Sequence, residues 1–407
     1  MRGGLLPIVL CGALAVPGVV LAADPGMTRM QAYARAAALE ALGRVMFSDP
    51  ALSASGKMAC STCHDAKRAF GPPNALDVQI GGKDMKQAGQ RAVPSLTYLQ
   101  VVPQFTEHYY ESDDEGDASV DNGPTGGLTW DGRADRGRDQ ARFPLLSPYE
   151  MANENEAAVA AKIRQASYAA EFDKIFGADA LKDDAKIFAA AIEALEVFEQ
   201  SERDFYPYSS KYDAYLAGRA QLTEQEARGL KLFDDEDKGN CASCHRSSID
   251  NDGTPPQFTD YGLIAIGLPR NTNIPVNADP NYFDLGVCGP LRTDLANRPE
   301  YCGLFRTPSL RNVALRKTFY HNGAEHDLHK AVEFYVERDT RPEKWYPRGP
   351  DGKVAKFNDL PRQYWDNINM EPPFGGKPGD RPRLSPGEID DIVAFLNALT
   401  DGYKPAP

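Results

Sequence analysis

The chain has 407 residues and a net charge of −13, with 42% apolar and 25% charged residues. This composition is typical of a globular protein with a well-formed core, and the length predicts two or three domains. The acidic balance argues against nucleic acid as a partner and favours a basic patch on another protein.

The first residues predict a targeting segment. Arg2 precedes the apolar run LLPIVLCGALAVPGVVLAA, and small residues around Ala22 suit a signal peptidase. We therefore expect residues 1–22 to be a cleaved signal peptide that directs the chain to the periplasm of a Gram-negative cell. The alternative is a retained membrane anchor, which Pro7 and Pro17 disfavour. No other stretch reaches the ~20 apolar residues that a span requires, so no anchor is expected after cleavage.

Two pentapeptides, CSTCH and CASCH, match the attachment motif of a c-type haem. Zinc is a weaker explanation, because it would need further ligands at matching spacing and the chain has only six histidines. The sequence therefore predicts two covalently bound haems, each held by two thioethers with a histidine as the first axial ligand. The residues concerned are Cys60, Cys63, His64, Cys241, Cys244 and His245.

Three of the seven cysteines lie outside these motifs. Cys11 leaves with the signal peptide, so Cys288 and Cys302 remain. An oxidising compartment favours a disulfide bond between them, which would contribute ~3 kcal/mol by closing its loop. The alternative is a reactive thiol, which we consider the weaker interpretation.

The segments around the motifs predict a mainly α fold. Residues 29–45 have helical composition, and Thr223 and Ser385 each open a capping box before a helix. The stretches 41–64 and 227–245 share one plan: a helix end with Gly, an apolar pair with Phe, an acidic turn and CxxCH. This repeat predicts two cytochrome c-like helical haem domains, related by internal duplication and connected by long loops.

The boundary between these domains is expected in the helical stretch 155–203, which gives an N-terminal domain at 23–175 and a C-terminal domain at 176–407. One further segment, 108–127, is acidic and Gly-rich without periodicity. It reads as a surface loop. It is either a solvated insertion or a lid or docking surface near the first haem.

The second axial ligands are less obvious than the first. The histidines outside the motifs are His108, His321, His326 and His329, and none lies between residues 65 and 107. No methionine lies between 152 and 369. The second iron therefore takes Met370, a histidine or an unusual ligand.

The segments LTWDGRADRGRDQARFPLLSPYEMA (128–152) and FRTPSLRNVALRKTFYHNG (305–323), together with the two CxxCH motifs, carry a resemblance. The chain resembles the bacterial di-haem cytochrome c peroxidases and the MauG enzymes over residues 37–403. In that family peroxide reacts at the N-terminal haem, while the C-terminal haem relays or stores oxidising equivalents.

The resemblance implies roles for individual residues. Trp130 matches the tryptophan between the haems, although it could be a core residue. Gln140 and Glu150 match the distal pair that assists O–O cleavage, whereas without the resemblance Glu150 would be a surface acid at a helix start. Arg306 matches an arginine near the haem–haem interface, suited to propionates, and His321 matches a histidine there. Alone, His321 could equally be a turn residue.

Two departures from the peroxidases are informative. Many of them hold a histidine after the first CxxCH that closes the peroxidatic iron, and the histidine-free run 65–107 predicts an open iron, as in MauG. His108 could reach back, although an acidic loop is usually solvated. Where the peroxidases carry an axial Met this chain has Tyr335, and MauG also has tyrosine. We expect Tyr335 to ligate the second iron, the alternative being a packing role on an amphipathic helix.

A calcium ion between the haems is common in the family. Here Ala92 replaces the usual asparagine, and LRKT at 315–318 replaces the usual LTAP. Backbone carbonyl ligands could survive these changes, so calcium stays open at this point.

We expect an oxidoreductase that uses hydrogen peroxide to oxidise an aromatic residue, in the first place tryptophan, of a periplasmic partner protein. RDTRPEKWYP (338–347) and the Cys288/Cys302 pair are most similar to the branch near the methanobactin-cluster enzyme, which converts a partner's tryptophan to kynurenine. The alternatives are a cytochrome c peroxidase that takes electrons from a small cytochrome c, and a non-catalytic di-haem electron carrier.

Overall fold

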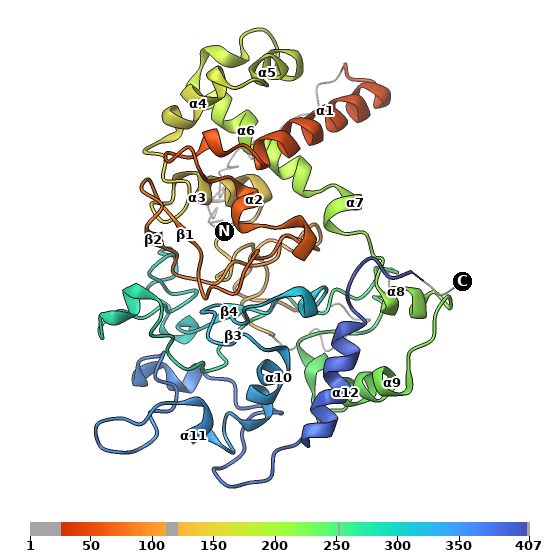
Figure 1. Cartoon of the computed structure of the whole chain (residues 1–407), viewed down its shortest axis with the longest axis vertical. Coiled ribbons are helices and arrows are strands. Elements are labelled where there is room, and N and C mark those ends of the chain that lie inside the picture. Colours follow the sequence, from red (N-terminus) through yellow and green to blue (C-terminus); the bar gives the residue numbers. More distant parts are fainter. Residues whose placement is uncertain (1–25, 111–120, 251–252, 405–407) are drawn as a thin grey trace, which may run out of the picture.

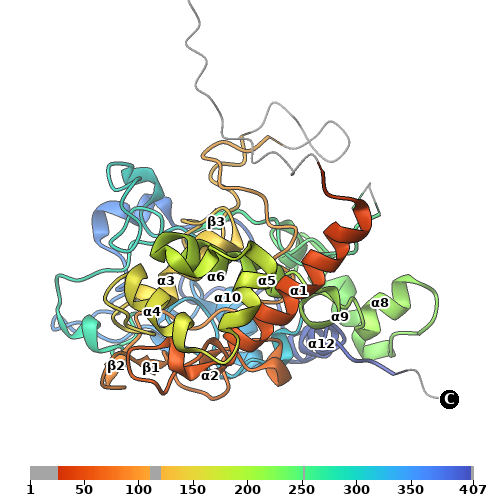
Figure 2. The ribbon, with the colours of Figure 1, turned by 90° about the horizontal axis from the view of Figure 1, so that it is seen from above.

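The computed structural model describes residues 26–110, 121–250 and 253–404. The predicted signal peptide 1–22 and the middle of the acidic segment 108–127 lie outside these ranges. Figure 1 shows the two halves of the chain stacked along the long axis, and the view from above in Figure 2 shows α1 and α6 running together. Within the described ranges no helix is long and apolar enough to span a membrane.

Over the described residues the fold is mainly helical, as predicted, with two short antiparallel strand pairs. The helices are α1 (Arg29–Phe47), α2 (Cys60–Cys63), α3 (Gly137–Leu146), α4 (Glu156–Gln165), α5 (Ala169–Phe176), α6 (Asp184–Glu199), α7 (Glu202–Phe205), α8 (Lys211–Leu216), α9 (Glu224–Asp234), α10 (Leu328–Glu337), α11 (Pro342–Trp345) and α12 (Pro386–Asn397). The strands are β1 (Ile80–Gly81) with β2 (Gln87–Ala88), and β3 (Leu263–Ile264) with β4 (Phe305–Arg306).

The two helix starts predicted from capping boxes, at Thr223 and Ser385, are confirmed. Thr223 accepts a hydrogen bond from the backbone N–H of Glu226, which starts α9, and Ser385 does the same for Glu388 at the start of α12. Both capping boxes are complete, so each satisfies backbone donors that the first helical turn leaves free. The helix predicted at 29–45 is α1, which runs to Phe47.

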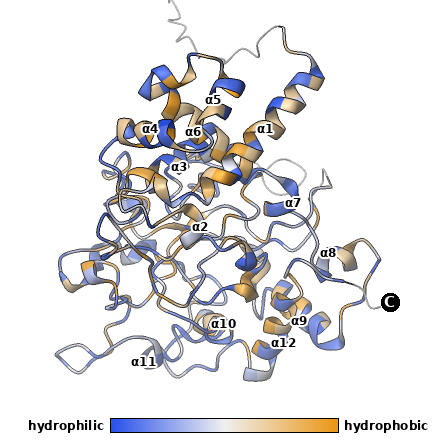
Figure 3. Cartoon of the chain, turned by 45° about the horizontal axis from the view of Figure 1, so that its top comes forward, coloured by the Kyte–Doolittle hydropathy of each residue, from blue (hydrophilic) through white to orange (hydrophobic). Residues whose placement is uncertain are grey.

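The first half is built on the crossing of α1 and α6. Gly43 brings the helices together, because a Cβ atom there would lie 2.0 Å from the carbonyl oxygen of Ala194. One turn further on, Phe47 packs on Phe198 with ring centroids 5.3 Å apart at 66°. The apolar faces of α1 and α6 meet in this crossing (Figure 3).

The second half repeats this arrangement with α9 and α12. A Cβ atom at Gly229 would lie 2.0 Å from the carbonyl oxygen of Asp391. Phe233 packs on Phe395 with centroids 5.3 Å apart at 65°. Glycine and phenylalanine are four residues apart in both helices, so the sequence repeat corresponds to one packing motif used twice.

The packing of α6 differs from the predicted domain division at 175/176. The core that contains α1 and the first CxxCH motif includes Ile187, Phe198 and Phe205, which all lie beyond residue 176. Helix α6 buries the apolar side of α1, and we therefore propose a domain boundary after α6. The second core begins at Tyr212.

Candidate active site

The first CxxCH motif lies in the wall of a large cavity. Cys60 and Cys63 begin and end the single-turn helix α2, and both thiols are free and partly buried. With His64 they line a cavity of about 1590 Å³. Drug-sized ligand sites usually enclose ~300–1,000 Å³, so this cavity has room for a group of macrocycle size.

His64 is oriented for metal ligation by its backbone neighbour. Its Nδ1 lies 2.7 Å from the carbonyl oxygen of Phe70, which adopts a left-handed φ of 51°. Burial lowers the pKa of His64 to about 4, so the ring is neutral and Nδ1–H donates to Phe70. This leaves Nε2 with a free lone pair, the arrangement found in metal-binding histidines.

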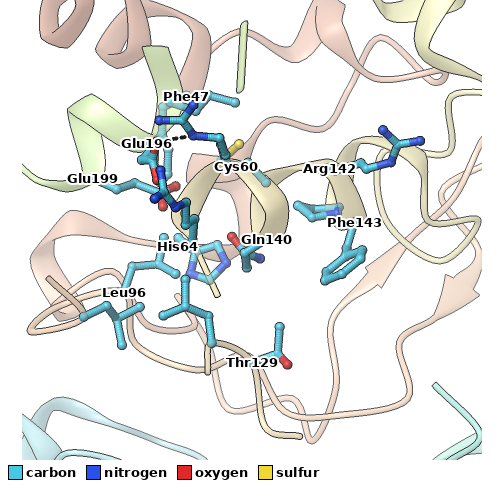
Figure 4. A pocket seen from close by; sticks show the side chains of 18 of the residues that line it. Phe47, Cys60, His64, Leu96, Thr129, Gln140, Arg142, Phe143, Glu196 and Glu199 are labelled. Carbon is cyan, nitrogen blue, oxygen red and sulfur yellow. Dashed lines mark hydrogen bonds and ion pairs between the residues drawn. The ribbon is translucent and has the colours of Figure 1, made fainter. Parts of the chain in front are cut away.

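Gln140 and Glu150 line the same cavity, as the resemblance implies. Gln140 lies on α3, and Figure 4 shows its side chain directed to the same space as His64. Glu150 is exposed on the wall of the cavity, although many protein atoms lie around its carboxyl group. Burial raises its pKa, against the opposing effects of Ser147 and Arg133.

The cavity contains a second acid that sequence reasoning did not identify. Glu199, at the end of α6, lines the cavity beside Glu196, which pairs with Arg138 at 2.8 Å. Burial, and secondly the charge of Glu196, raise the pKa of Glu199 to about 8. Glu199 therefore carries a proton at neutral pH. Figure 4 shows Glu199 and Glu196 on one side of the cavity.

Trp130, Arg306 and His321 come together where the two halves meet. The Trp130 indole N–H donates to the carbonyl oxygen of Ala92 at 2.8 Å, and the Arg306 backbone N–H donates to the Trp130 carbonyl oxygen at 2.7 Å. The His321 ring meets the Trp130 ring edge-on with centroids 6.4 Å apart and stacks on Phe305 at 3.4 Å. Trp130 and Arg306 also line the first cavity, while His321 and Phe305 line a separate small one.

Burial sets the charge state of this group. It lowers the pKa of His321 to about 3, so the imidazole is neutral. It lowers the pKa of Arg306 only to about 10, so the guanidinium stays charged. Among the described residues Arg306 forms no ion pair with a carboxylate, so it is a cation ready for an anionic group such as a propionate.

The second CxxCH motif has the same backbone arrangement as the first. His245 Nδ1 lies 2.9 Å from the carbonyl oxygen of Phe258, whose φ is 53°, and burial lowers the pKa of His245 to about 4. Cys241 and Cys244 are free thiols. This site therefore also presents two sulfurs and a neutral histidine with a free Nε2.

Tyr335 lies on α10, in the second half of the chain. Burial raises its pKa, and the sulfurs of Cys244 and Cys241 add to the rise, which places them within electrostatic reach of the phenol. No residue that the structure describes is hydrogen-bonded to its hydroxyl group. The ring stacks on Phe374 with centroids 5.4 Å apart, and the Arg338 guanidinium lies 3.8 Å from the centroid of Phe374.

The other candidate ligands for the irons are engaged elsewhere. Met370 is 46% exposed, and its sulfur accepts a hydrogen bond from Arg338. The three remaining histidines pair with carboxylates: His108 with Asp121 at 2.5 Å, His326 with Asp77 at 2.8 Å and His329 with Asp390 at 3.2 Å. His108 is exposed at the surface and does not line the first cavity.

Cys288 and Cys302 form a disulfide bond in the loop region of the second half. The residues present at both CxxCH motifs fit a c-type haem, because each supplies two thiols and a neutral histidine, and the first opens onto a cavity of sufficient size. When bound, haem iron supplies peroxide reduction and one-electron chemistry that side chains alone do not provide.

Comparisons with known proteins agree with this geometry. A family model described as di-haem cytochrome c peroxidase matches residues 37–221. The methylamine utilization protein MauG of Paracoccus denitrificans is 35% identical over 379 residues, which cover 90% of each chain. Cytochrome c551 peroxidase of Nitrosomonas europaea is 27% identical over 81% of this chain and 82% of its own.

Solved structures show the same relationship. The di-haem peroxidase BthA of Burkholderia thailandensis has 40% sequence identity and a TM-score of 0.79, covering 89% of this chain and 86% of BthA. A MauG-like protein associated with microbial copper homeostasis has 26% identity and a TM-score of 0.61, covering 89% of both chains. The chain therefore belongs to the di-haem cytochrome c peroxidase and MauG family of oxidoreductases.

Proposed function

We propose that the protein is a periplasmic, MauG-like di-haem enzyme that uses hydrogen peroxide to oxidise an aromatic residue, in the first place tryptophan, of a partner protein. Cys60, Cys63 and His64 hold the peroxidatic haem in this proposal, and Cys241, Cys244 and His245 hold the second. Reduction of one peroxide to two water molecules takes up two protons and two electrons, and the partner's aromatic side chain supplies the electrons.

Glu150 and Gln140 are the proposed proton-handling pair of the first cavity. A carboxyl group with a raised pKa can accept a proton from one peroxide oxygen and return it to the other. Gln140 can donate a hydrogen bond from the same side. Trp130 is the proposed route for charge between the sites, with Arg306 and His321 fixing its surroundings.

The observation that carries the proposal is that Tyr335 lies within electrostatic reach of Cys241 and Cys244, while the partly exposed Met370 accepts a hydrogen bond from Arg338. A thioether favours reduced iron, whereas an anionic phenolate favours the higher oxidation states. A haem with tyrosine as its ligand is hard to reduce, so it is a poor entry point for electrons from a small cytochrome c. It suits the storage of an oxidising equivalent.

Electron paramagnetic resonance of the resting ferric holoenzyme tests this assignment. We expect one high-spin haem at the open first site and one low-spin haem at the second. Tyr335→Phe should change the low-spin signal alone. Tyr320→Phe is the matched control. The ring centroids of Tyr320 and Tyr335 are 6.4 Å apart, but the Tyr320 hydroxyl group donates to the Ala331 carbonyl oxygen. Two low-spin signals in the unmodified protein would contradict the proposal and indicate an electron carrier.

Steady-state kinetics separate the proposal from its closest rival. Some relatives are named cytochrome c peroxidases, and such an enzyme would oxidise reduced cytochrome c rapidly with peroxide. We expect slow turnover with reduced cytochrome c. Rapid turnover that survives in Tyr335→Phe would instead identify a peroxidase supplied by a donor cytochrome.

A further inference from the structure

The contact between the two halves contains a half-buried cation that the proposed function does not use. Arg316 lies on the loop between β4 and α10, and it forms no ion pair with a carboxylate among the described residues. Burial lowers its pKa only to about 10, so it is charged at neutral pH. Withdrawing a guanidinium even partly from water without an acidic partner costs free energy, so its backbone partners need to be identified.

The Arg316 guanidinium is held by backbone carbonyl groups from both halves. Nη2 donates to the carbonyl oxygen of Val93 at 3.1 Å, and Nε donates to that of Thr318 at 3.1 Å. Its Nη1 lies against Gly71, in the loop that follows the first CxxCH motif: a Cβ atom on Gly71 would be 3.7 Å away. Gly71 is bridged to Asp65, the residue after His64, so the guanidinium lies near the first site.

A second arginine makes the reciprocal connection. Arg68, in the first half, donates from Nη1 to the Leu315 carbonyl oxygen at 3.3 Å. The first half therefore binds the carbonyl group of Leu315, while Arg316 binds that of Val93 in the first half. This pair of contacts connects the loop after the first CxxCH motif to the 315–318 loop of the second half.

A calcium ion, which the family resemblance allows at this place, does not fit the residues present. Calcium requires six to eight oxygen ligands at ~2.3–2.6 Å. Ala92 has no side-chain oxygen, and its carbonyl oxygen accepts the Trp130 indole hydrogen bond. The carbonyl oxygens of Val93 and Thr318 accept from Arg316. A dication here would meet the guanidinium charge directly.

We propose that the guanidinium of Arg316 is the fixed cation between the two haem sites, in place of a bound calcium ion, and that it positions the two halves relative to one another. Arg316 is a positioning residue and takes no part in the chemistry. A permanent charge of this kind neither dissociates nor responds to chelators.

Metal analysis of the purified holoenzyme gives the first test. We expect no stoichiometric calcium after dialysis, and we expect a calcium chelator to leave the ferric spectrum and the melting temperature unchanged. One retained equivalent of calcium, or a spectral change on chelation that calcium reverses, would overturn the inference. This test uses the unmodified protein, so it does not depend on any variant folding.

Substitution of Arg316 gives the second test, read out by potentiometric titration of the haems. Arg316→Gln should shift the first haem to a lower reduction potential, since removal of a nearby positive charge stabilises ferric iron, and should lower the melting temperature. Arg316→Lys should leave the reduction potential unchanged, because lysine keeps the positive charge. It should lower the melting temperature by less than Arg316→Gln does, because lysine does not reproduce both hydrogen bonds to Val93 and Thr318. Arg219→Gln, at an exposed position, is the control. An unchanged potential in Arg316→Gln contradicts the inference, whatever the substrate of the enzyme.

Discussion

Glu199 shows how a single buried acid links the first cavity to pH. Its pKa of about 8 lies above the ordinary value of 4.5, because burial and Glu196 both disfavour the carboxylate. Between these two values the folded protein binds a proton at Glu199 that the unfolded chain has released. Stability from this group is therefore complete below about pH 4.5 and is lost as the pH rises through about 8.

Glu199→Gln should remove this dependence. The amide keeps the shape of the protonated acid and cannot ionise, so the variant should gain stability over the unmodified protein as the pH rises from 5 to 9. One group changes the free energy of unfolding by at most about 1.4 kcal/mol per pH unit. Thermal melting of both holoenzymes across this range measures the difference. Glu193→Gln is the control, since Glu193 is an acid on the same helix that is paired with Arg35. If the melting temperatures of Glu199→Gln and the unmodified protein changed with pH in parallel, Glu199 would not be the buried acid proposed.

At the scale of elements, each half contains a pair of helices that cross closely at a glycine. Gly43 and Gly229 allow α1 on α6 and α9 on α12 to approach until the backbone of one helix meets that of the other. The same spacing to Phe47 and Phe233, and nearly equal ring geometries, show that both halves use one packing motif, while internal duplication stays a prediction from the sequence repeat.

Alanine at either glycine should separate the crossing helices. The new Cβ atom would lie 2.0 Å from a carbonyl oxygen, and relief requires the helices to move apart. Such overpacking costs ~1–3 kcal/mol. Gly387→Ala, near the start of α12, is the control, because nothing lies within 4 Å of its Cβ position and helical Gly→Ala stabilises by up to ~1 kcal/mol. Denaturant unfolding followed by far-ultraviolet circular dichroism measures all three variants. Equal stabilities for Gly43→Ala and Gly387→Ala would show that the crossing tolerates a side chain.

At the scale of the molecule, the parts predictable from the sequence are those whose chemistry is contiguous. CSTCH and CASCH carry the two thiols and the histidine of a site within five residues, and Thr223 and Ser385 carry their own caps. Tyr335 is different, because nothing around it distinguishes a ligand from a packed residue. Its prediction as a ligand depended on the register of a family resemblance, and the structure adds only that Cys241 and Cys244 lie within electrostatic reach of the phenol.

The parts that were missed depend on contacts between distant segments. In the sequence, Glu199 looks like any acid near a helix end. It lines the cavity only because α6 packs on α1. The same packing explains the difference from the boundary at 175/176, since composition does not show which half a helix joins. Arg316 likewise becomes informative only when Val93, more than two hundred positions earlier, is seen to accept its hydrogen bond.

The two halves and the C-terminal segment are joined by a buried cluster around Arg311. Its guanidinium pairs with both carboxylate oxygens of Asp213, at 2.9 and 3.1 Å, and lies 4.6 Å from the ring centroid of Tyr98 in the first half. The Tyr98 hydroxyl donates to Asp401, near the C-terminus, at 2.8 Å. Arg311 and Asp213 have side chains only 1% and 8% exposed, so their charges depend on one another.

Arg311→Met should destabilise the protein by about 3–5 kcal/mol at neutral pH, because it leaves the Asp213 carboxylate buried without its partner. In the unmodified protein Arg311 is the main group that lowers the pKa of Asp213 against the effect of burial, so the pair contributes stability above the ordinary carboxyl pKa of 3.8 and loses it as the pH falls. Without Arg311, burial raises the pKa of Asp213, so the deficit of the variant should shrink as the pH falls from 7 to 4 and this carboxylate takes up a proton. Adding Asp213→Asn to Arg311→Met should recover part of the loss at pH 7, since no buried charge then remains. Urea unfolding at pH 7 and pH 4 measures these differences, and a deficit that is the same at both values would show that Arg311 acts through its packing on Tyr98 rather than through its charge.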